Sequence, residues 1–250
     1  MGKWSYENNG IFVTADGEVV TIMIDKPETK NGTDWKAMVA MNEAYEKIAE
    51  DEELRVVVLK GNGEYFFTGG RVNPNDPEDS RMYAKTLSQT GNRKKCNLPV
   101  IAAVNGHCLK AGMGMLIGAD MAVARDDVQF AFPELRMGGV PMLVMAGCMD
   151  YIPKKIALEA YYSSEPFDAQ TAYRFGLVNA VTDAEHFDEV LDKYIHKIID
   201  YPRALIQMTH DAYYAMEAMD TKAERMEYAK KTLAEKVLPQ MAKEKQSYNV

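Results

Sequence analysis

Residues 98–134, which read LPVIAAVNGHCLKAGMGMLIGADMAVARDDVQFAFPE, decide the fold of this chain. Residues 98–104 form an uncharged apolar run, which predicts a strand buried on both faces. Residues 111–118 follow as a short helix that is apolar on nearly every side. Two more short strands are expected after it, and a carboxylate, Glu134, comes directly after a proline.

The start of that predicted helix lacks large side chains. Ala111, Gly112 and Gly114 leave the first turn open, so another molecule can approach the backbone closely. Free N–H groups at a helix N-terminus stabilise negative charge that develops during a reaction. A buried strand, an open helix start and the nearby acid Glu134 together indicate an active site.

Strands alternate with helices before and through this stretch, and helices dominate after it. Asp16–Gly17 separates two β-rich runs and is a hairpin signal. Strands are expected at residues 11–15, 19–25, 56–59, 65–68, 98–104, 121–124, 128–132 and 177–181. Helices are expected at residues 34–51, 81–95, 111–118, 153–163, 168–175, 184–199 and from 202 onward, with a polar loop over 73–80. The pattern predicts an α/β core over residues 1–195 and a helical region over 196–250.

Composition excludes several classes of function. The 250 residues are 47% hydrophobic and 26% charged, as in ordinary globular proteins. A net charge of −8 argues against nucleic acid as the partner, because phosphate binding needs a basic surface. The three cysteines lack metal-ligand spacing, which predicts a reduced compartment and no structural metal. No run resembles a leader or a membrane span, so a cytoplasmic location is expected.

Two glycine-containing turns each follow a predicted strand, at residues 66–70 (FFTGG) and 106–114 (GHCLKAGMG). Each of them can be a simple tight turn. Two such turns followed by a buried helix also suit a pair of backbone N–H groups that bind an oxyanion. Neither turn matches GxGxxG or GxxxxGK[ST], so nucleotide binding of those kinds is not predicted.

Five segments in register resemble the successive signatures of the crotonase (enoyl-CoA hydratase/isomerase) superfamily. They are IDKPETKNG, VVVLKGNGEYFFTGG, PVIAAVNGHCLKAGMGM, GADMAVARDDVQFAFPELRMGGVP and FDAQTAYRFGLVNAV. The resemblance spans about residues 10–183, and the helical tail resembles the trimerisation region of the family. It implies an α/β spiral of ββα units that acts on a thioester of coenzyme A without a further cofactor. It also implies a homotrimer or a dimer of trimers.

The resemblance also implies roles for particular residues. The thioester carbonyl would lie between the N–H groups of Gly70 and Ala111, with Gly69 beside the substrate and Glu134 as acid and base. Hydratases of the family carry a second glutamate where this chain has Gly114. One carboxylate can take a proton from one carbon and return it to another, so isomerisation of an enoyl-CoA double bond is the first expectation.

Other reactions stay open at this point. Hydration would need another side chain as the second acid or base. Hydrolysis of a carbon–carbon or thioester bond would need a nucleophilic water held by His107 or by a tyrosine of the tail. His107 is the first candidate for the second acid or base, since histidine titrates near neutral pH; hydrogen bonding to backbone is its other possible role. A non-catalytic acyl-CoA binding protein is an alternative of another class, although the presence of Glu134 speaks against it.

The sequence alone also leaves open the roles of the candidate binding residues. Lys26 and Lys30 lie on the loop that the family places along the adenosine part of coenzyme A, or they are simply solvated. Arg71 suits a coenzyme A phosphate, a substrate carboxylate or solvent. Cys108 and Cys148 are expected to be small buried apolar residues. The methionines over residues 137–149 either line the acyl pocket or pack the core.

Overall fold

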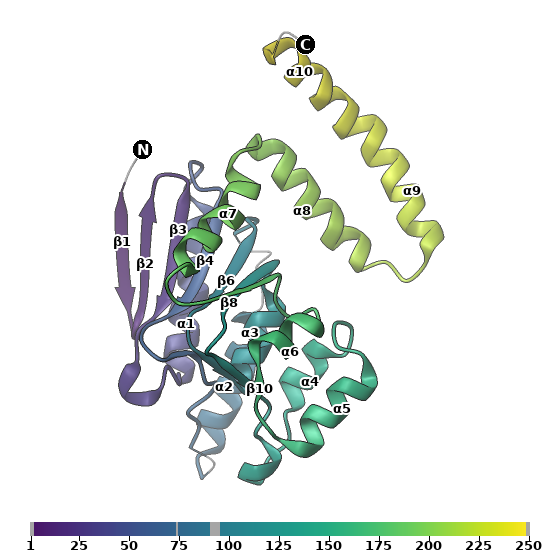
Figure 1. The fold of residues 1–250 in the computed structure, drawn as a ribbon. Coiled ribbons are helices and arrows are strands. Elements are labelled where there is room, and N and C mark those ends of the chain that lie inside the picture. Colours follow the sequence, from purple (N-terminus) through teal and green to yellow (C-terminus); the bar gives the residue numbers. More distant parts are fainter. Residues whose placement is uncertain (1–2, 74, 91–95, 249–250) are drawn as a thin grey trace. The chain divides into compact units, whose positions relative to one another are not determined.

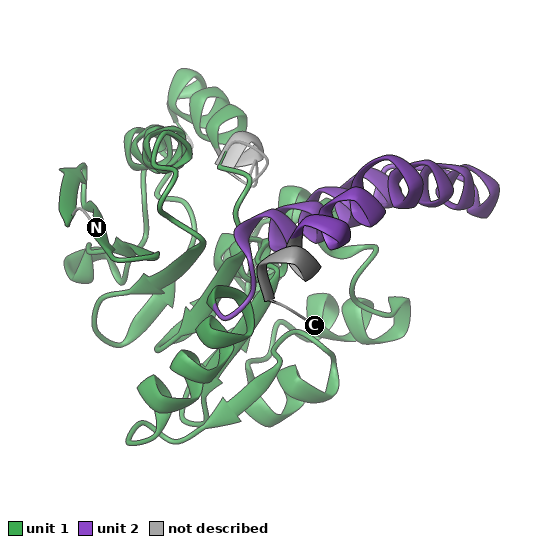
Figure 2. Ribbon diagram, turned by 90° about the horizontal axis from the view of Figure 1, so that it is seen from above, with its two compact units in different colours: residues 1–199 green, residues 200–250 purple. Residues whose placement is uncertain are grey.

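The computed structural model describes residues 3–73, 75–90 and 96–248. The chain divides into two units, residues 1–199 and residues 200–250 (Figure 2). The sequence places this division at residue 195, and the structure places it after Ile199. Every helix in the described ranges is too short or too polar to traverse a lipid bilayer.

The first unit contains a seven-stranded sheet in the order β1-β2-β3-β4-β6-β8-β11 (Figure 1). Its strands are β1 (Trp4–Asn8), β2 (Ile11–Asp16), β3 (Val19–Ile24), β4 (Val56–Gly61), β6 (Val100–Val104), β8 (Met121–Arg125) and β11 (Ala180–Thr182). The first three strands pair antiparallel, and the sheet is parallel from β3 onward. All five residues of β6 are buried, as its uncharged run predicts.

A second sheet has four short strands in the order β10-β9-β7-β5. They are β5 (Tyr65–Phe67), β7 (His107–Leu109), β9 (Gln129–Ala131) and β10 (Phe167–Asp168). β5, β7 and β9 are parallel neighbours, and β10 is antiparallel to β9. The sequence did not predict β7 or β10, because residues 107–109 and 167–168 form no alternating or β-rich run of their own.

The two sheets are linked by a repeating connection. β4 leads to β5, β6 leads to β7, and β8 leads to β9, so each turn of the chain adds one strand to each sheet. Successive turns are bonded at their corners, where the amide of Asn105 donates to the carbonyl of Gly61 at 2.8 Å and accepts from its N–H at 3.2 Å. With α3 after β7, this is the spiral of ββα units that the resemblance implies.

Helices complete the first unit. They are η1 (Pro27–Thr29), α1 (Trp35–Ala49), α2 (Pro77–Thr90), α3 (Ala111–Gly118), η3 (Leu135–Met137), α4 (Met142–Cys148), α5 (Lys154–Ser163), α6 (Ala169–Arg174) and α7 (Phe187–Ile199). The predicted loop over 73–80 is wrong from Pro77 onward. Asp76 accepts from the N–H groups of Glu78 and Asp79, and Pro77 suits a first helical turn, so α2 begins there. The predicted helix over 81–95 ends at Thr90 among the described residues, and residues 91–95 lie outside them.

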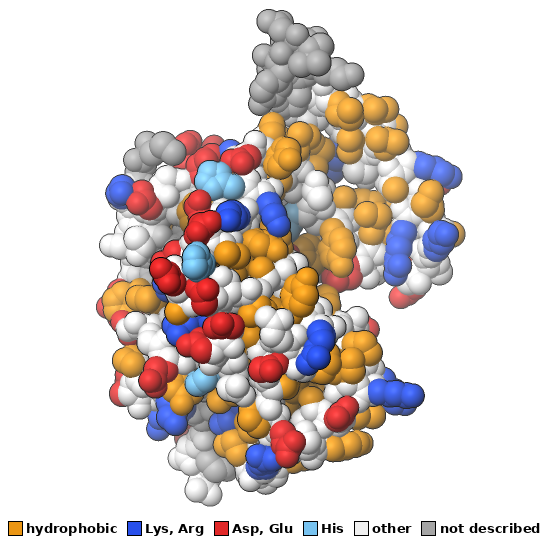
Figure 3. Space-filling view, viewed as in Figure 1, with side chains coloured by type: hydrophobic (Ala, Val, Ile, Leu, Met, Phe, Trp, Pro, Cys, Tyr) orange, Lys and Arg blue, Asp and Glu red, His pale blue; other side chains and the backbone are white. Residues whose placement is uncertain are grey.

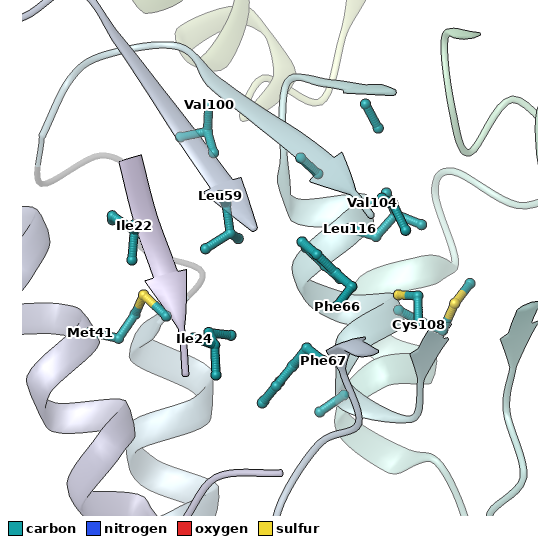
Figure 4. Packing of buried hydrophobic residues seen from close by; sticks show 14 of the residues in the cluster. Ile22, Ile24, Met41, Leu59, Phe66, Phe67, Val100, Val104, Cys108 and Leu116 are labelled. Carbon is teal, nitrogen blue, oxygen red and sulfur yellow. The ribbon is translucent and has the colours of Figure 1, made fainter. Parts of the chain in front are cut away.

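One apolar cluster joins both sheets to their helices (Figure 4). Met41 of α1 belongs to it with Ile22 and Ile24 of β3, and Phe66 and Phe67 bring β5 into the same cluster. All five side chains are fully buried. Burying each of them stabilises the fold by roughly 1.5–3 kcal/mol.

The second unit is helical: α8 (Arg203–Glu217), α9 (Lys222–Thr232), the π-helical turn η4 (Leu233–Val237) and α10 (Leu238–Tyr248). Thr221 and Glu224 form a reciprocal capping box at the start of α9. No residue of α8 is buried, and large apolar side chains of the unit are exposed, among them Tyr213, Met226, Leu233 and Leu238.

Candidate functional site

The candidate residues follow the three parallel strands of the smaller sheet. Gly69 and Gly70 come after β5, Ala111 follows β7, and Glu134 comes after β9. Parallel neighbours end at the same edge of a sheet, so these three segments meet there. The order β9-β7-β5 puts the Ala111 segment between the other two.

The first glycine pair is held against the segment before α1. The N–H of Thr33 donates to the carbonyl of Gly69 at 3.0 Å, and the N–H of Arg71 donates to the carbonyl of Thr33 at 2.8 Å. In such a parallel bridge the N–H of the intervening residue, Gly70, points away from Thr33. Gly69 has φ of +85°, which glycine adopts without strain. A Cβ on Gly69 would lie 3.0 Å from the backbone nitrogen of Ala111, so the two predicted N–H segments are neighbours.

Ala111 is the first residue of α3, and the first N–H groups of a helix have no acceptor within the helix. Lys110 precedes it with φ of +54° and ψ of −124°, an unusual conformation for a residue with a side chain. A Cβ on Gly112 would lie 2.2 Å from the carbonyl oxygen of Phe67, so only glycine lets α3 approach β5 this closely. The open helix start therefore lies against the end of β5.

Glu134 is half-buried, and its Oε2 atom is buried without a hydrogen-bond partner among the described residues. Its backbone carbonyl accepts from the N–H groups of Met137 and Gly139 at 3.0 and 2.8 Å, which fixes the backbone at this position. Burial raises the pKa of its carboxyl, while a backbone hydrogen bond and the Lys110 ammonium oppose the shift. A carboxyl with a raised pKa suits proton transfer near neutral pH.

Gly114 lies on α3 with space beside it. A Cβ there would meet only the Cγ2 atom of Val144, at the ordinary contact distance of 3.9 Å. The backbone therefore admits a side chain at the position where hydratases of the family carry their second glutamate.

Two residues beside Glu134 were not singled out as site residues by the sequence. Tyr161 of α5 and Cys148 of α4 are buried, and the charge of Glu134 contributes to raising the pKa of both. Burial is the larger cause, and it raises the pKa of the Cys148 thiol to about 12. A tyrosine in a helical segment carries no local sequence signal for such a position. Cys108 is also fully buried with a raised pKa, so both thiols are un-ionised at neutral pH.

His107 is placed apart from Glu134, at the corner where β6 meets β7. It lines a cleft of about 410 Å³ together with Glu64, Asn105, Arg125 and Asp127. Its Nδ1 atom accepts from the N–H of Gln129 at 3.0 Å, and its ring packs edge-on against Tyr65. The structure thus gives His107 the backbone hydrogen bond that was one of its two expected roles. The described residues contain no group of three or more His, Cys, Asp or Glu side chains arranged to hold a metal ion.

The predicted coenzyme A loop is organised by Asn31. This fully buried amide accepts from the N–H of Lys26 at 2.9 Å and donates to the carbonyls of Asn62 and Tyr65 at 2.9 and 2.5 Å. Lys30 is exposed, with its ammonium 5.3 Å from the ring centroid of Tyr65. Only the Asn-Gly turn signal could have drawn attention to Asn31 from the sequence.

The side chains of Lys26 and Arg71 lie near the same loop. The Lys26 ammonium donates to the carbonyl of Asn9 at 3.4 Å, and the exposed Arg71 lies beside Gly32. Lys26 and Lys30 of this loop, and Arg71 of the segment after β5, are therefore three cations near the bridge between Thr33 and Gly70.

Comparison with known proteins assigns a family to this arrangement. The model of the enoyl-CoA hydratase/isomerase family matches residues 14–248. A carnitinyl-CoA dehydratase of Proteus mirabilis is 30% identical over 71% of this chain and 69% of its own length, and one of Salmonella typhi is 27% identical over 85% and 83%. The solved enoyl-CoA hydratase of Mycobacterium smegmatis is 26% identical, with a TM-score of 0.85 over 91% of this chain and 90% of its own. The chain is therefore an enzyme of the enoyl-CoA hydratase/isomerase family, the crotonase superfamily, and has its α/β fold.

Proposed function

We propose that this enzyme moves the double bond of an enoyl-CoA, with Glu134 as the group that carries the proton. The observation that supports this most is one half-buried carboxyl with a raised pKa, while the position of a second glutamate is occupied by Gly114. A single carboxylate suffices for a proton shift between two carbons, whereas two carboxylates hold and activate water for hydration.

In the proposed reaction the thioester oxygen accepts hydrogen bonds from the N–H groups of Gly70 and Ala111. Glu134 removes a proton from the carbon next to the thioester, and the electron pair of that C–H bond forms a dienolate. The negative charge on oxygen is stabilised by the two N–H groups and by the N-terminus of α3. The same carboxyl then returns the proton to the γ-carbon, which leaves the double bond conjugated with the thioester.

The coenzyme A end of the substrate is proposed to bind along the loop that carries Lys26 and Lys30, with Arg71 beside it and Gly69 and Gly114 next to the thioester. Phosphates on coenzyme A supply the negative charge that these cations attract. Calorimetry should therefore detect binding of an acyl-CoA and no binding of the corresponding free acid. Equal affinity for the two would contradict this part of the proposal.

Hydration is the second candidate, because the curated relatives named above are carnitinyl-CoA dehydratases. It requires a second acid or base near the β-carbon of the substrate. The structure does not favour His107 for that role, since the residues that line its cleft do not include Glu134 and its Nδ1 atom accepts from the backbone N–H of Gln129. The two candidates predict different products from the same enzyme.

The test is to incubate the enzyme with 3-enoyl-CoA and with crotonyl-CoA in deuterated water. We expect conjugation of the 3-enoyl substrate, deuterium at the α- or γ-carbon, and little hydrated product. Glu134→Gln should bind acyl-CoA normally and lose about 10²–10⁴-fold in rate, the usual contribution of a positioned acid–base group. Glu159→Gln, an exposed glutamate of α5, is the matched control and should keep the wild-type rate. Rapid hydration of crotonyl-CoA would overturn isomerisation in favour of the second candidate.

We also propose that the enzyme assembles as a homotrimer or a dimer of trimers. In the second unit the apolar side chains of Tyr213, Leu233 and Leu238 are exposed by 59%, 49% and 53%. On the first unit, Figure 3 shows apolar side chains over α4 and α5, and Met142 and Leu143 of α4 are exposed. Surfaces of this kind are typical of interfaces between protein chains. Sedimentation that gives a stable monomer at micromolar concentration would contradict the assembly.

A further inference from the structure

Two buried polar atoms on neighbouring segments lack an oxygen or nitrogen hydrogen-bond partner among the described residues. They are the hydroxyl of Tyr161 and the Oε2 atom of Glu134. One is a donor and the other an acceptor when the carboxyl is ionised. A buried polar atom without a partner destabilises the fold, so each such atom needs an explanation.

Packing holds the Tyr161 ring on the segment that carries Glu134. The ring lies edge-on to Phe132, with centroids 4.8 Å apart and an interplanar angle of 82°. Phe132 precedes Glu134 by two residues and is itself buried, as is Tyr161 at 5% exposure. Tyr161 is therefore fixed by α5 on one side and by the Phe132 contact on the other.

The titratable groups around Tyr161 and Glu134 come from α4, β7 and the residue before α3. The Tyr161 hydroxyl donates toward the sulfur of Cys148 on α4, which is a weak acceptor. Lys110 before α3 is the cation that acts on Glu134, and Cys108 on β7 lies near Cys148. Burial, the Cys148 thiol and the Glu134 charge all raise the pKa of the Tyr161 hydroxyl. The hydroxyl therefore keeps its proton and remains a donor throughout the working pH range.

We propose that Tyr161 is a positioning residue, whose hydroxyl donates to Oε2 of Glu134 in the working enzyme. The hydrogen bond leaves the other carboxylate oxygen to exchange the proton with the substrate. It also stabilises the ionised carboxylate, so Tyr161 lowers the pKa of Glu134 and opposes the increase caused by burial. This inference rests on the proposed function, because it concerns the orientation and ionisation of the carboxyl that carries the proton in that reaction. The resemblance implies no role for Tyr161.

The test compares Tyr161→Phe with Tyr162→Phe. The first change removes one hydroxyl and keeps the ring on Phe132, and the second removes a hydroxyl that is exposed to solvent on the same helix. Without the donor the carboxylate is less stable and its pKa rises. We expect the acid limb of the kcat/KM profile of Tyr161→Phe to move up by about one pH unit, with kcat about tenfold lower and KM unchanged. Tyr162→Phe should match the wild type.

A purely structural role would change thermal stability without moving the pH profile. An unmoved acid limb with wild-type kcat in Tyr161→Phe would overturn the inference. Cys148→Ala gives an independent measurement, since it removes the thiol toward which the Tyr161 hydroxyl donates. We expect its acid limb not to move upward, because Tyr161 still serves Glu134. An upward shift in Cys148→Ala would assign the stabilisation to the thiol and would also overturn the inference.

Failure of the proposed function gives a different result. If the wild-type enzyme neither exchanges substrate protons with deuterated water nor isomerises 3-enoyl-CoA, the function is wrong for every variant alike. If the wild type is active, Glu134→Gln is inactive and Tyr161→Phe is indistinguishable from the wild type, only the role of Tyr161 is wrong.

Discussion

Replacing Gly70 by alanine tests the proposed oxyanion site through one steric contact. A Cβ on Gly70 would lie 2.3 Å from Cζ, 2.5 Å from Cε1 and 2.7 Å from the hydroxyl oxygen of Tyr83. Carbon atoms pack at about 3.5–4.0 Å, so the contact is too short by more than about 1 Å. Tyr83 is buried in the core cluster and cannot swing into solvent, so the backbone at Gly70 must move.

The size of the effect follows from that movement. A displacement of about 1 Å at a catalytic group lowers the rate about 10²-fold, and loss of one oxyanion donor lowers it about 10²–10³-fold. We expect kcat of Gly70→Ala to fall at least 10²-fold in the isomerisation assay, which follows the absorbance of the conjugated thioester. Overpacking should also lower the free energy of unfolding by about 1–3 kcal/mol.

Two control variants distinguish loss of the Gly70 N–H contact from a general loss of stability. Gly118→Ala, at the end of α3, adds a methyl group with no heavy atom within 4 Å and should keep the wild-type rate. Adding Tyr83→Ala to Gly70→Ala removes the clashing ring, so the double variant should be more active than Gly70→Ala although less stable. Wild-type kcat in a folded Gly70→Ala protein would refute the assignment of the thioester oxygen to this N–H group.

Three further predictions follow from other contacts. Gly114→Glu should fold, because its Cβ meets only Val144, and should raise the hydration of crotonyl-CoA by about 10²-fold, whereas Gly118→Glu should not. Because burial raises the pKa of Glu134, the rate should fall on acidification at a pH above the ordinary glutamate value of 4.5; a kcat–pH profile with no loss until lower pH would contradict this. Asn31→Ala should lower the free energy of unfolding by about 1–3 kcal/mol, since the carbonyls of Asn62 and Tyr65 lose the donor that the buried Asn31 amide gives them. Chemical denaturation should show a much smaller loss for Asn9→Ala, which has a similar positive φ at an exposed position.

Sequence patterns predicted elements such as β6 and α3, whose residues are almost all apolar. β6 is buried at every residue and α3 is apolar on nearly every side, so both are visible from composition alone. β7 was not predicted, since its three residues are set by pairing with β5 and β9 rather than by their own pattern. The start of α2 was missed because the stretch around it is polar and contains proline, a composition that also suits a loop. In the structure Asp76 caps the helix by accepting from the N–H of Glu78.

Some residues of the candidate site could be predicted from the sequence and others could not. The N–H groups of Gly70 and Ala111 were assigned through the family resemblance, whereas Glu134 was also singled out from the sequence as a carboxylate that follows a predicted strand and a proline. The neighbours of these residues could not be predicted. Tyr83 and Tyr161 lie on helices α2 and α5, outside the segments that carry the resemblance, and only the packing of those helices brings their rings to the site. Their local sequence is that of ordinary helical residues.

Lys110 shows how this fold sets activity against stability. It has a side chain at a backbone conformation that suits glycine, which destabilises the folded state by about 1–3 kcal/mol. The same conformation turns the chain from β7 into α3, and the ammonium group acts on Glu134. An engineer seeking a more heat-resistant enzyme would choose glycine at this position. That choice would relax the turn and also remove the Lys110 ammonium, which favours ionised Glu134, so we expect the more robust protein to be the poorer catalyst.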